Sequence, residues 1–105
     1  MAGKSRRQQI QEMLAEDPGD PFLRYGLAMD YAGAREYEPA ARCFEELLRD
    51  SPDYVPGYLQ AAKVLRELNR DDEARAVARA GVLAARRKGE EHAAGELEAF
   101  LDDLG

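Results

Sequence analysis

The sequence predicts an all-α protein of about six antiparallel helices, arranged as a short repeat. The first observation is a period: the proline breaks at Pro18 and Pro52 stand 34 residues apart, the length of one kind of helix–turn–helix repeat. The second is spacing: apolar residues recur at helical intervals, and no run alternates with period two as a half-buried strand would. Ala, Glu, Leu and Arg dominate the composition, and all four favour helices.

Turn and capping residues divide the chain into six expected helices. Asp20 is a good N-cap for the second helix, and Pro21 suits the first helical position because its missing N–H is not needed there. Asp53 is expected to cap the fourth helix, and Asp71 to open the fifth with acidic residues that favour the helix dipole. Gly89 ends the fifth helix. The expected helices cover residues 5–16, 21–33, 37–49, 54–68, 72–87 and 90–104.

The two end helices are expected to cap the array. The tail of the first, LAEDPGD, resembles LRDSPDY one period later, so this helix corresponds to the second half of a missing repeat. The last helix has an apolar stripe that needs a surface, and the fifth helix offers one. Repeat arrays need such atypical end units to cover their last apolar faces. We therefore expect a single domain over 1–105, divided into a half-repeat cap (5–20), two repeats (21–54 and 55–88) and a capping helix (89–105).

Large and small residues follow one another in a specific order along both repeats. Counted from Pro21, the first repeat has Leu27, Ala28, Tyr31, Tyr37, Ala40, Phe44, Leu47 and Pro52. Counted from Val55, the second has Tyr58, Ala61, Ala62, Leu65, Ala74 and Ala78. This order resembles that of the tetratricopeptide repeat family, in which the small residues lie where two helices approach closely. The resemblance implies a right-handed α-α superhelix with a concave groove.

Four residues depart from the family pattern, and one of them, Arg86, stands where the closing proline of the second repeat is expected. Arg24 stands where a large apolar residue is usual, so we expect the start of the second helix to pack differently. Arg35 stands where Gly normally adopts a positive φ to end the first helix of a repeat, and Gly33 is the alternative end of that helix. Gly81 replaces the residue equivalent to Leu47.

The resemblance also implies which residues line the groove. The candidate partner-binding residues are Phe22, Tyr25, Met29, Leu59, Lys63 and Arg66. Phe22, Tyr25 and Met29 share an arc of the second helix opposite its expected packing face, so this helix is either sandwiched or binds something. Cover by the N-terminal helix is the structural alternative. Lys63 and Arg66 beside an aromatic floor would favour an apolar peptide with a nearby carboxylate.

Two functions remain open at this stage. The first is a protein–protein interaction module, a scaffold or adaptor whose groove holds a peptide or helix of a partner. The second is a self-assembling unit, a homodimer whose seam is the Phe22, Tyr25 and Met29 arc, since two repeats are fewer than are usually needed for stability. The Lys and Asn set with which the family clamps a terminal carboxylate is absent apart from Lys63, so that role is not carried over.

Composition argues against other classes. The net charge of −6 disfavours nucleic-acid binding, which needs a basic face. No apolar run of about 18 residues suggests a membrane span, and no secretory signal is visible. His92 and Glu96 alone make a weak metal site, and Cys43 is expected to be a buried, inert thiol. We therefore expect no enzyme, no cofactor and no metal, and a cytoplasmic location because one cysteine cannot form an internal disulfide.

Overall fold

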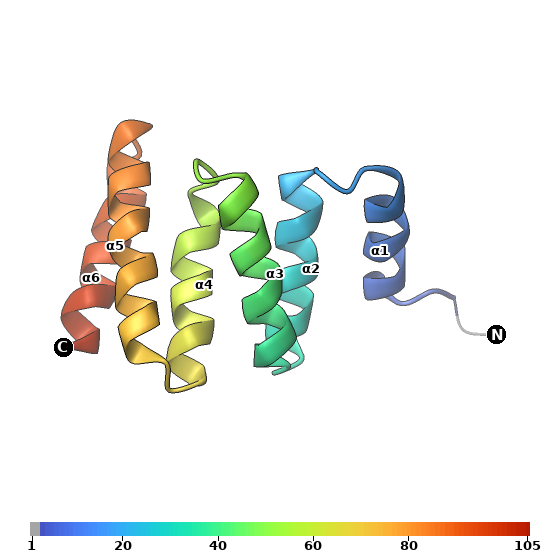
Figure 1. The fold of residues 1–105 in the computed structure, drawn as a ribbon, viewed down its shortest axis with the longest axis horizontal. Coiled ribbons are helices and arrows are strands. Elements are labelled where there is room, and N and C mark those ends of the chain that lie inside the picture. The colour runs from blue at the N-terminus through green and yellow to red at the C-terminus, as the bar shows by residue number, and fades with distance from the viewer. Residues whose placement is uncertain (1–2) are drawn as a thin grey trace.

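The computed structural model describes residues 3–105, and this part of the chain contains six helices packed in sequence as antiparallel pairs (Figure 1). The helices are α1 (Arg6–Glu16), α2 (Pro21–Gly33), α3 (Tyr37–Asp50), α4 (Pro56–Glu67), α5 (Asp71–Arg87) and α6 (Glu91–Leu104). The predicted all-α repeat fold is confirmed. The stack is 48 Å long and 20 Å across its shortest axis, as expected when each helix packs mainly on its neighbours.

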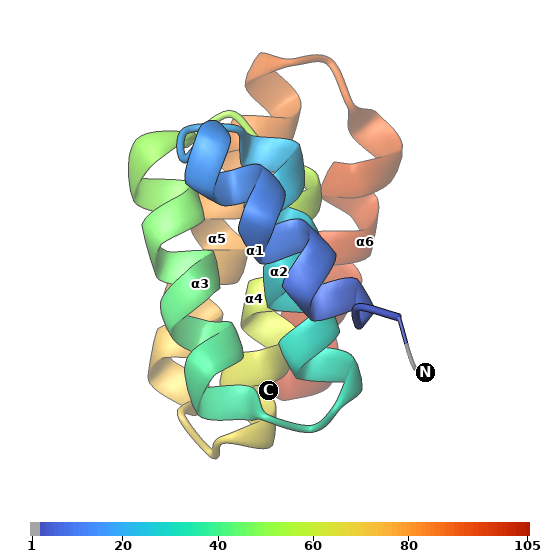
Figure 2. The same ribbon diagram turned by 90° about the vertical axis from the view of Figure 1, so that its right-hand side faces the viewer.

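The stack has two sides. Seen end-on in Figure 2, α3 and α5 lie on one side, and α2 and α6 lie on the other, with α1 crossing in front of α2. The inner helices α2, α4 and α6 contact one another in that order, α2 with α4 and α4 with α6. None of the helices of the described chain is both long enough and apolar enough to cross a membrane.

The start of α4 differs from the prediction. The helix begins at Pro56, after Val55, and no side chain caps it, so the prediction that Asp53 is its N-cap is wrong. A turn holds the preceding residues instead, because the Tyr54 N–H donates to the Ser51 carbonyl over 3.0 Å. Pro56 then starts the helix without needing a capping acceptor for its own nitrogen. The predicted cap of α2 is confirmed, since Asp20 accepts from the Phe22 N–H over 2.9 Å.

Three tight turns close with the same hydrogen-bond pattern. After α2, the Glu36 N–H donates to the Tyr31 carbonyl over 2.9 Å and the Arg35 N–H donates to the Ala32 carbonyl over 3.0 Å, which is the Schellman arrangement. Arg35 itself takes φ 61°, although α2 ends at Gly33. The corresponding turns after α4 and α5 place Asn69 at φ 61° and Gly89 at φ 72°. The turn geometry is therefore kept even where the residue is not glycine.

Small residues lie at the helix crossings. The residues with no exposed surface include Ala28, Ala40, Ala62 and Ala74, as the repeat pattern predicts. Gly81 marks the tightest approach: a Cβ built there would lie 2.6 Å from Tyr58 Cβ and 3.0 Å from Leu97 Cδ1. The departure at Gly81 thus has a physical reason, because the Tyr58 ring of α4 occupies the space that a larger residue would need.

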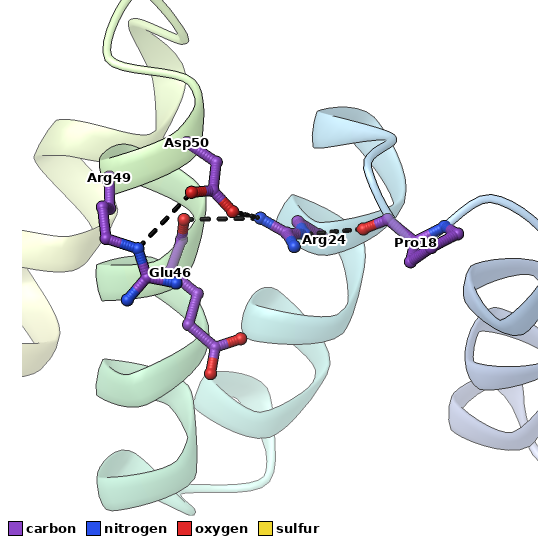
Figure 3. Close-up of polar contacts among 5 residues, drawn as sticks. All are labelled: Pro18, Arg24, Glu46, Arg49 and Asp50. Atoms are coloured by element: carbon purple, nitrogen blue, oxygen red, sulfur yellow. Dashed lines mark hydrogen bonds and ion pairs between the residues drawn. The ribbon is translucent and has the colours of Figure 1, made fainter.

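Arg24 joins α2 to the end of α3 (Figure 3). Its guanidinium donates to the Pro18 carbonyl over 2.8 Å and to the Asp50 carboxylate over 2.6 Å. This pairing holds the pKa of the Asp50 carboxyl below its usual value. The expectation that α2 packs differently at its start is confirmed, because hydrogen bonds and an ion pair of Arg24 replace an apolar contact. The position of this cation at the C-terminal end of α3 is also favoured by the helix dipole.

We predict that Gly81→Ala lowers the free energy of unfolding by about 2 kcal/mol, because the Tyr58 Cβ cannot move away without displacing α4. The matched control is Gly95→Ala in α6, where an added Cβ meets nothing within 4 Å. This variant should raise the free energy of unfolding by about 0.5–1 kcal/mol, because alanine favours a helix more than glycine does. Urea titrations of both variants measure the two changes. A stabilised Gly81→Ala protein would contradict the close approach.

Candidate functional site

The inner helices together form a hollow surface. A pocket of about 260 Å³ lies where α2, α4 and α6 meet. Tyr25 contributes from α2, Leu59 and Gln60 from α4, and Ala93 and Glu96 from α6. The remaining lining residues are Val55, Pro56, Glu90 and Leu97. Most of the lining residues are apolar, and the two carboxylates come from the α6 side.

A second hollow adjoins the first. It has a volume of about 620 Å³ and lies between α1 and α2, where its lining includes Met13, Phe22, Tyr25 and Met29. Tyr25 lines both hollows, so they lie on either side of one side chain, the first toward α4 and α6 and the second toward α1. We call the two hollows together the inner trough.

The N-terminal helix covers only part of α2. Ile10, which is 7% exposed, packs over Gly26, since a Cβ at Gly26 would lie 3.6 Å from Ile10 Cδ1. Phe22, at 70% exposed, is left open beside it, and Met13 of α1 is 47% exposed. The sequence left open whether the N-terminal helix covers the arc of α2 or leaves it exposed. In the structure α1 covers the centre of this arc at Gly26 and leaves Phe22, in the first turn, exposed.

An arginine fixes α1 in this position. Arg7 donates to the Asp30 carboxylate over 2.7 Å and to the Glu36 carboxylate over 2.6 Å. Its guanidinium carbon also lies 4.1 Å from the centre of the Tyr31 ring, within the range of a cation–π contact. The hydrogen bond from Arg7 to Glu36, followed by that to Asp30, raises the pKa of Arg7. One side chain thereby ties α1 to the C-terminal half of α2 and to the turn that follows.

Tyr25 is not the surface residue that its helical arc suggests. Its ring packs edge-on against Phe44 at 6.3 Å between centroids and tilts against Tyr54 at 5.5 Å. Burial, with a smaller effect of Tyr54, raises the pKa of the Tyr25 hydroxyl. The prediction that the packing of the repeat does not need this arc is wrong for Tyr25, because Phe44 of α3 and Tyr54 of the turn before α4 both pack against its ring. Met29 is likewise half-buried against the same cluster.

The predicted cations have different surroundings. Leu59 lies in the trough as expected, and Lys63, one turn further along α4, is exposed and forms no ion pair with any of residues 3–105. Arg66 is already engaged: it donates to Asp103 over 3.2 Å and its guanidinium carbon lies 4.8 Å from the centre of the Phe100 ring. That Arg66 binds a partner carboxylate stays a prediction, and in the free chain α6 provides it with a counter-charge and an aromatic face.

Sequence reasoning missed the contribution of α6. Glu90, Ala93 and Glu96 line the trough, although the last helix was expected only to cap the array. The repeat period could have revealed this contribution, because successive residues among Tyr25, Leu59 and Ala93 are 34 positions apart. Ala93 is therefore equivalent to two residues already expected in the groove. The capping helix thus stands where the first helix of a third repeat would stand.

Other groups show little sign of chemistry. No three His, Cys, Asp or Glu side chains gather as metal ligands within the described residues. Burial raises the pKa of the Cys43 thiol, which is half-buried, and this lowers its reactivity. His92 is 93% exposed and lies 3.6 Å from Glu96.

The opposite side of the stack carries another groove. It lies between α3 and α5 over α4 and has a volume of about 590 Å³. Apolar residues that include Phe44, Leu65, Val77 and Ala80 line it together with the charged residues Glu45, Arg49, Arg70 and Glu73. Leu83, one turn beyond Ala80 on α5, is 60% exposed. This outer groove is the natural rival to the inner trough as a binding surface.

Comparison with solved structures decides the family. A tetratricopeptide repeat domain protein from Salinibacter ruber is 33% identical to this chain, and the match covers 81% of this chain and 94% of that one with a TM-score of 0.77. This chain belongs to the tetratricopeptide repeat family. No protein-family model and no curated protein sequence matches it.

Two further solved structures share the fold at lower identity. Protein BPP2914 from Bordetella parapertussis is 24% identical over 97% of this chain and 89% of that one, with a TM-score of 0.83. PcrH, in complex with the chaperone binding region of PopD, is 18% identical over 93% of this chain and 74% of that one, with a TM-score of 0.86. At these identities the likeness shows the fold alone.

For this tetratricopeptide repeat protein we predict that Tyr25→Asp lowers the free energy of unfolding by about 2–4 kcal/mol, because it removes an aromatic contact and half-buries a carboxylate. Phe22→Asp is the matched control, and it should change stability by less than about 0.5 kcal/mol because the site is exposed. Thermal melts of both variants make the comparison. Equal Tm values would contradict the packing of Tyr25 against Phe44 and Tyr54.

Proposed function

We propose that this protein is a non-enzymatic interaction module that holds a segment of a partner protein in the inner trough. The observation that carries the proposal is the exposed Phe22 ring, 70% open to solvent, in one of two hollows that adjoin at Tyr25. Large aromatic rings dominate binding energy where a partner can enclose them. An exposed aromatic next to a preformed apolar hollow therefore favours binding over a purely structural role.

The candidate contact residues are those that reach the trough. Phe22 and Leu59 would supply apolar contact, and the half-buried Tyr25 and Met29 would shape the floor. Lys63 lies at the edge as the one predicted cation that keeps an exposed charge without a partner among residues 3–105. In PcrH the same architecture is seen with a region of another protein, and this precedent for the fold supports the proposal without identifying a partner.

Self-assembly is the alternative, and the same exposed residues favour it. Met13 and Phe22 lie on either side of the hollow between α1 and α2, and a second copy would cover both. Light scattering on the wild-type chain separates the two possibilities. A monomer favours the module, and a dimer that dissociates when Phe22 is replaced would support the homodimer.

The test of the module uses two matched surface variants. We predict that Phe22→Ser weakens binding of a partner recovered from the source organism by about 30-fold or more, because a buried aromatic anchor contributes about 2–4 kcal/mol. Leu83→Ser, on the opposite side and 60% exposed, should change binding by less than about twofold. Calorimetric titration of each variant gives the affinities, after thermal melts show that both are folded. Loss of binding in Leu83→Ser alone would move the function to the outer groove.

A further inference from the structure

The inner trough has a distribution of charge that the sequence does not reveal. Near the first turns of α2 and α4 its lining is apolar, from Phe22 to Leu59. On the α6 side the same lining carries Glu90 and Glu96, and it includes no lysine or arginine. Crossing the helices at this level, the surface therefore changes from apolar to acidic.

The basic residues around this strip have other partners or lie outside the lining of the pocket. Lys88, in the turn before α6, donates to the Asp53 carbonyl over 3.4 Å and does not line the pocket. Arg66 is held by Asp103 and Phe100 at the last turns of α4 and α6, and Lys63 lies one turn beyond Leu59 and outside the lining of the pocket. Arg6 lines the hollow between α1 and α2, but α1 runs antiparallel to α2, and the neighbouring Arg7 pairs with Asp30 near the end of α2. The two glutamates thus have no basic residue of this chain in the pocket with them.

Their local partners leave most of the charge uncompensated. Glu90 forms no ion pair with any residue between 3 and 105. Glu96 has only His92 at 3.6 Å, and that imidazole is 93% exposed. The lining beside the two glutamates is apolar and consists of Leu59, Ala93 and Leu97. The methylene groups of a lysine or arginine side chain can pack along this surface while the charged group stays near the carboxylates.

We infer that the trough takes an extended protein segment with an apolar side chain at Phe22 and a lysine or arginine at Glu90 and Glu96. The inference rests on the proposed function and reverses the charge that Lys63 and Arg66 suggest in the sequence. Neighbouring helix axes lie about 8–10 Å apart, so the path from α2 across α4 to α6 is about 20 Å. At about 3.3 Å per residue an extended chain covers this path in about six residues.

Complementary charge of this kind sets orientation and selectivity more than total affinity. The acidic side of the trough would attract the basic end of the segment and repel an acidic one, so that the segment lies in one direction. Since both glutamates are accessible to solvent, their effect should weaken as salt is raised.

The test selects peptides from a random 12-residue phage-displayed library on the intact chain. Selected peptides should be enriched in Lys or Arg about six residues from an apolar residue, and their binding should fall about tenfold with Glu90→Lys/Glu96→Lys. Asp102→Lys is the control, because it reverses an exposed carboxylate of the same helix, α6, that lines neither hollow, and it should change affinity by less than about twofold. Lys63→Glu is measured beside it. Fluorescence anisotropy at low and high salt measures each peptide on each variant.

The outcomes separate the inference from the function on which it rests. Enrichment of acidic peptides, or of apolar peptides without charge preference, overturns the inference and leaves the interaction module standing. Peptides whose binding depends on Lys63 but not on Glu90 and Glu96 also overturn it. Failure to select any peptide that depends on Phe22, or a dimer whose seam fills the trough, overturns both.

Discussion

The structure depends on how closely its helices approach one another. Ala28 and Ala40 in the α2–α3 pair, and Ala62 and Ala74 in the α4–α5 pair, have no exposed surface. Larger side chains at these crossings would separate the helices and lose dispersion contacts across the whole interface. Because each pair is held at a short, fixed distance, the inner helices stand side by side and the trough between them exists before any partner binds. Preformed surfaces of this kind lose less entropy on binding.

The periodic part of the fold could be predicted from the sequence, and the exceptions follow from tertiary contacts. The helices, their order and their crossings could be predicted from small residues that recur with the 34-residue period. Such residues are a reliable signal because two helices can approach closely only where the side chains between them are small. Asp53 and Tyr25 could not be placed correctly. The cap at Asp53 is replaced by a turn that the Ser51 carbonyl closes, and Tyr25 is packed by residues about 20 to 30 positions away along the chain.

The electrostatic character of the site was the least predictable part. Lys63 and Arg66 follow Leu59 on the same helix, so the sequence suggests a basic groove. In the structure Arg66 is paired with Asp103 from α6, while Glu90 and Glu96 of the α6 segment line the hollow. Whether a charge is available to a partner depends on which helix packs beside it, and the one-dimensional pattern does not contain that information. The departure at Arg24 has the same origin, since its partner Asp50 lies in α3.

The central claim is that the binding surface lies on the inner helices. Nuclear magnetic resonance measures this most directly, through changes in backbone amide shifts of the isotope-labelled chain as a bound segment is added. The account predicts that the changes concentrate in the first two turns of α2, in α4 around Leu59 and in α6 around Ala93. Changes confined to α3 and α5, around the outer groove and Leu83, would contradict it.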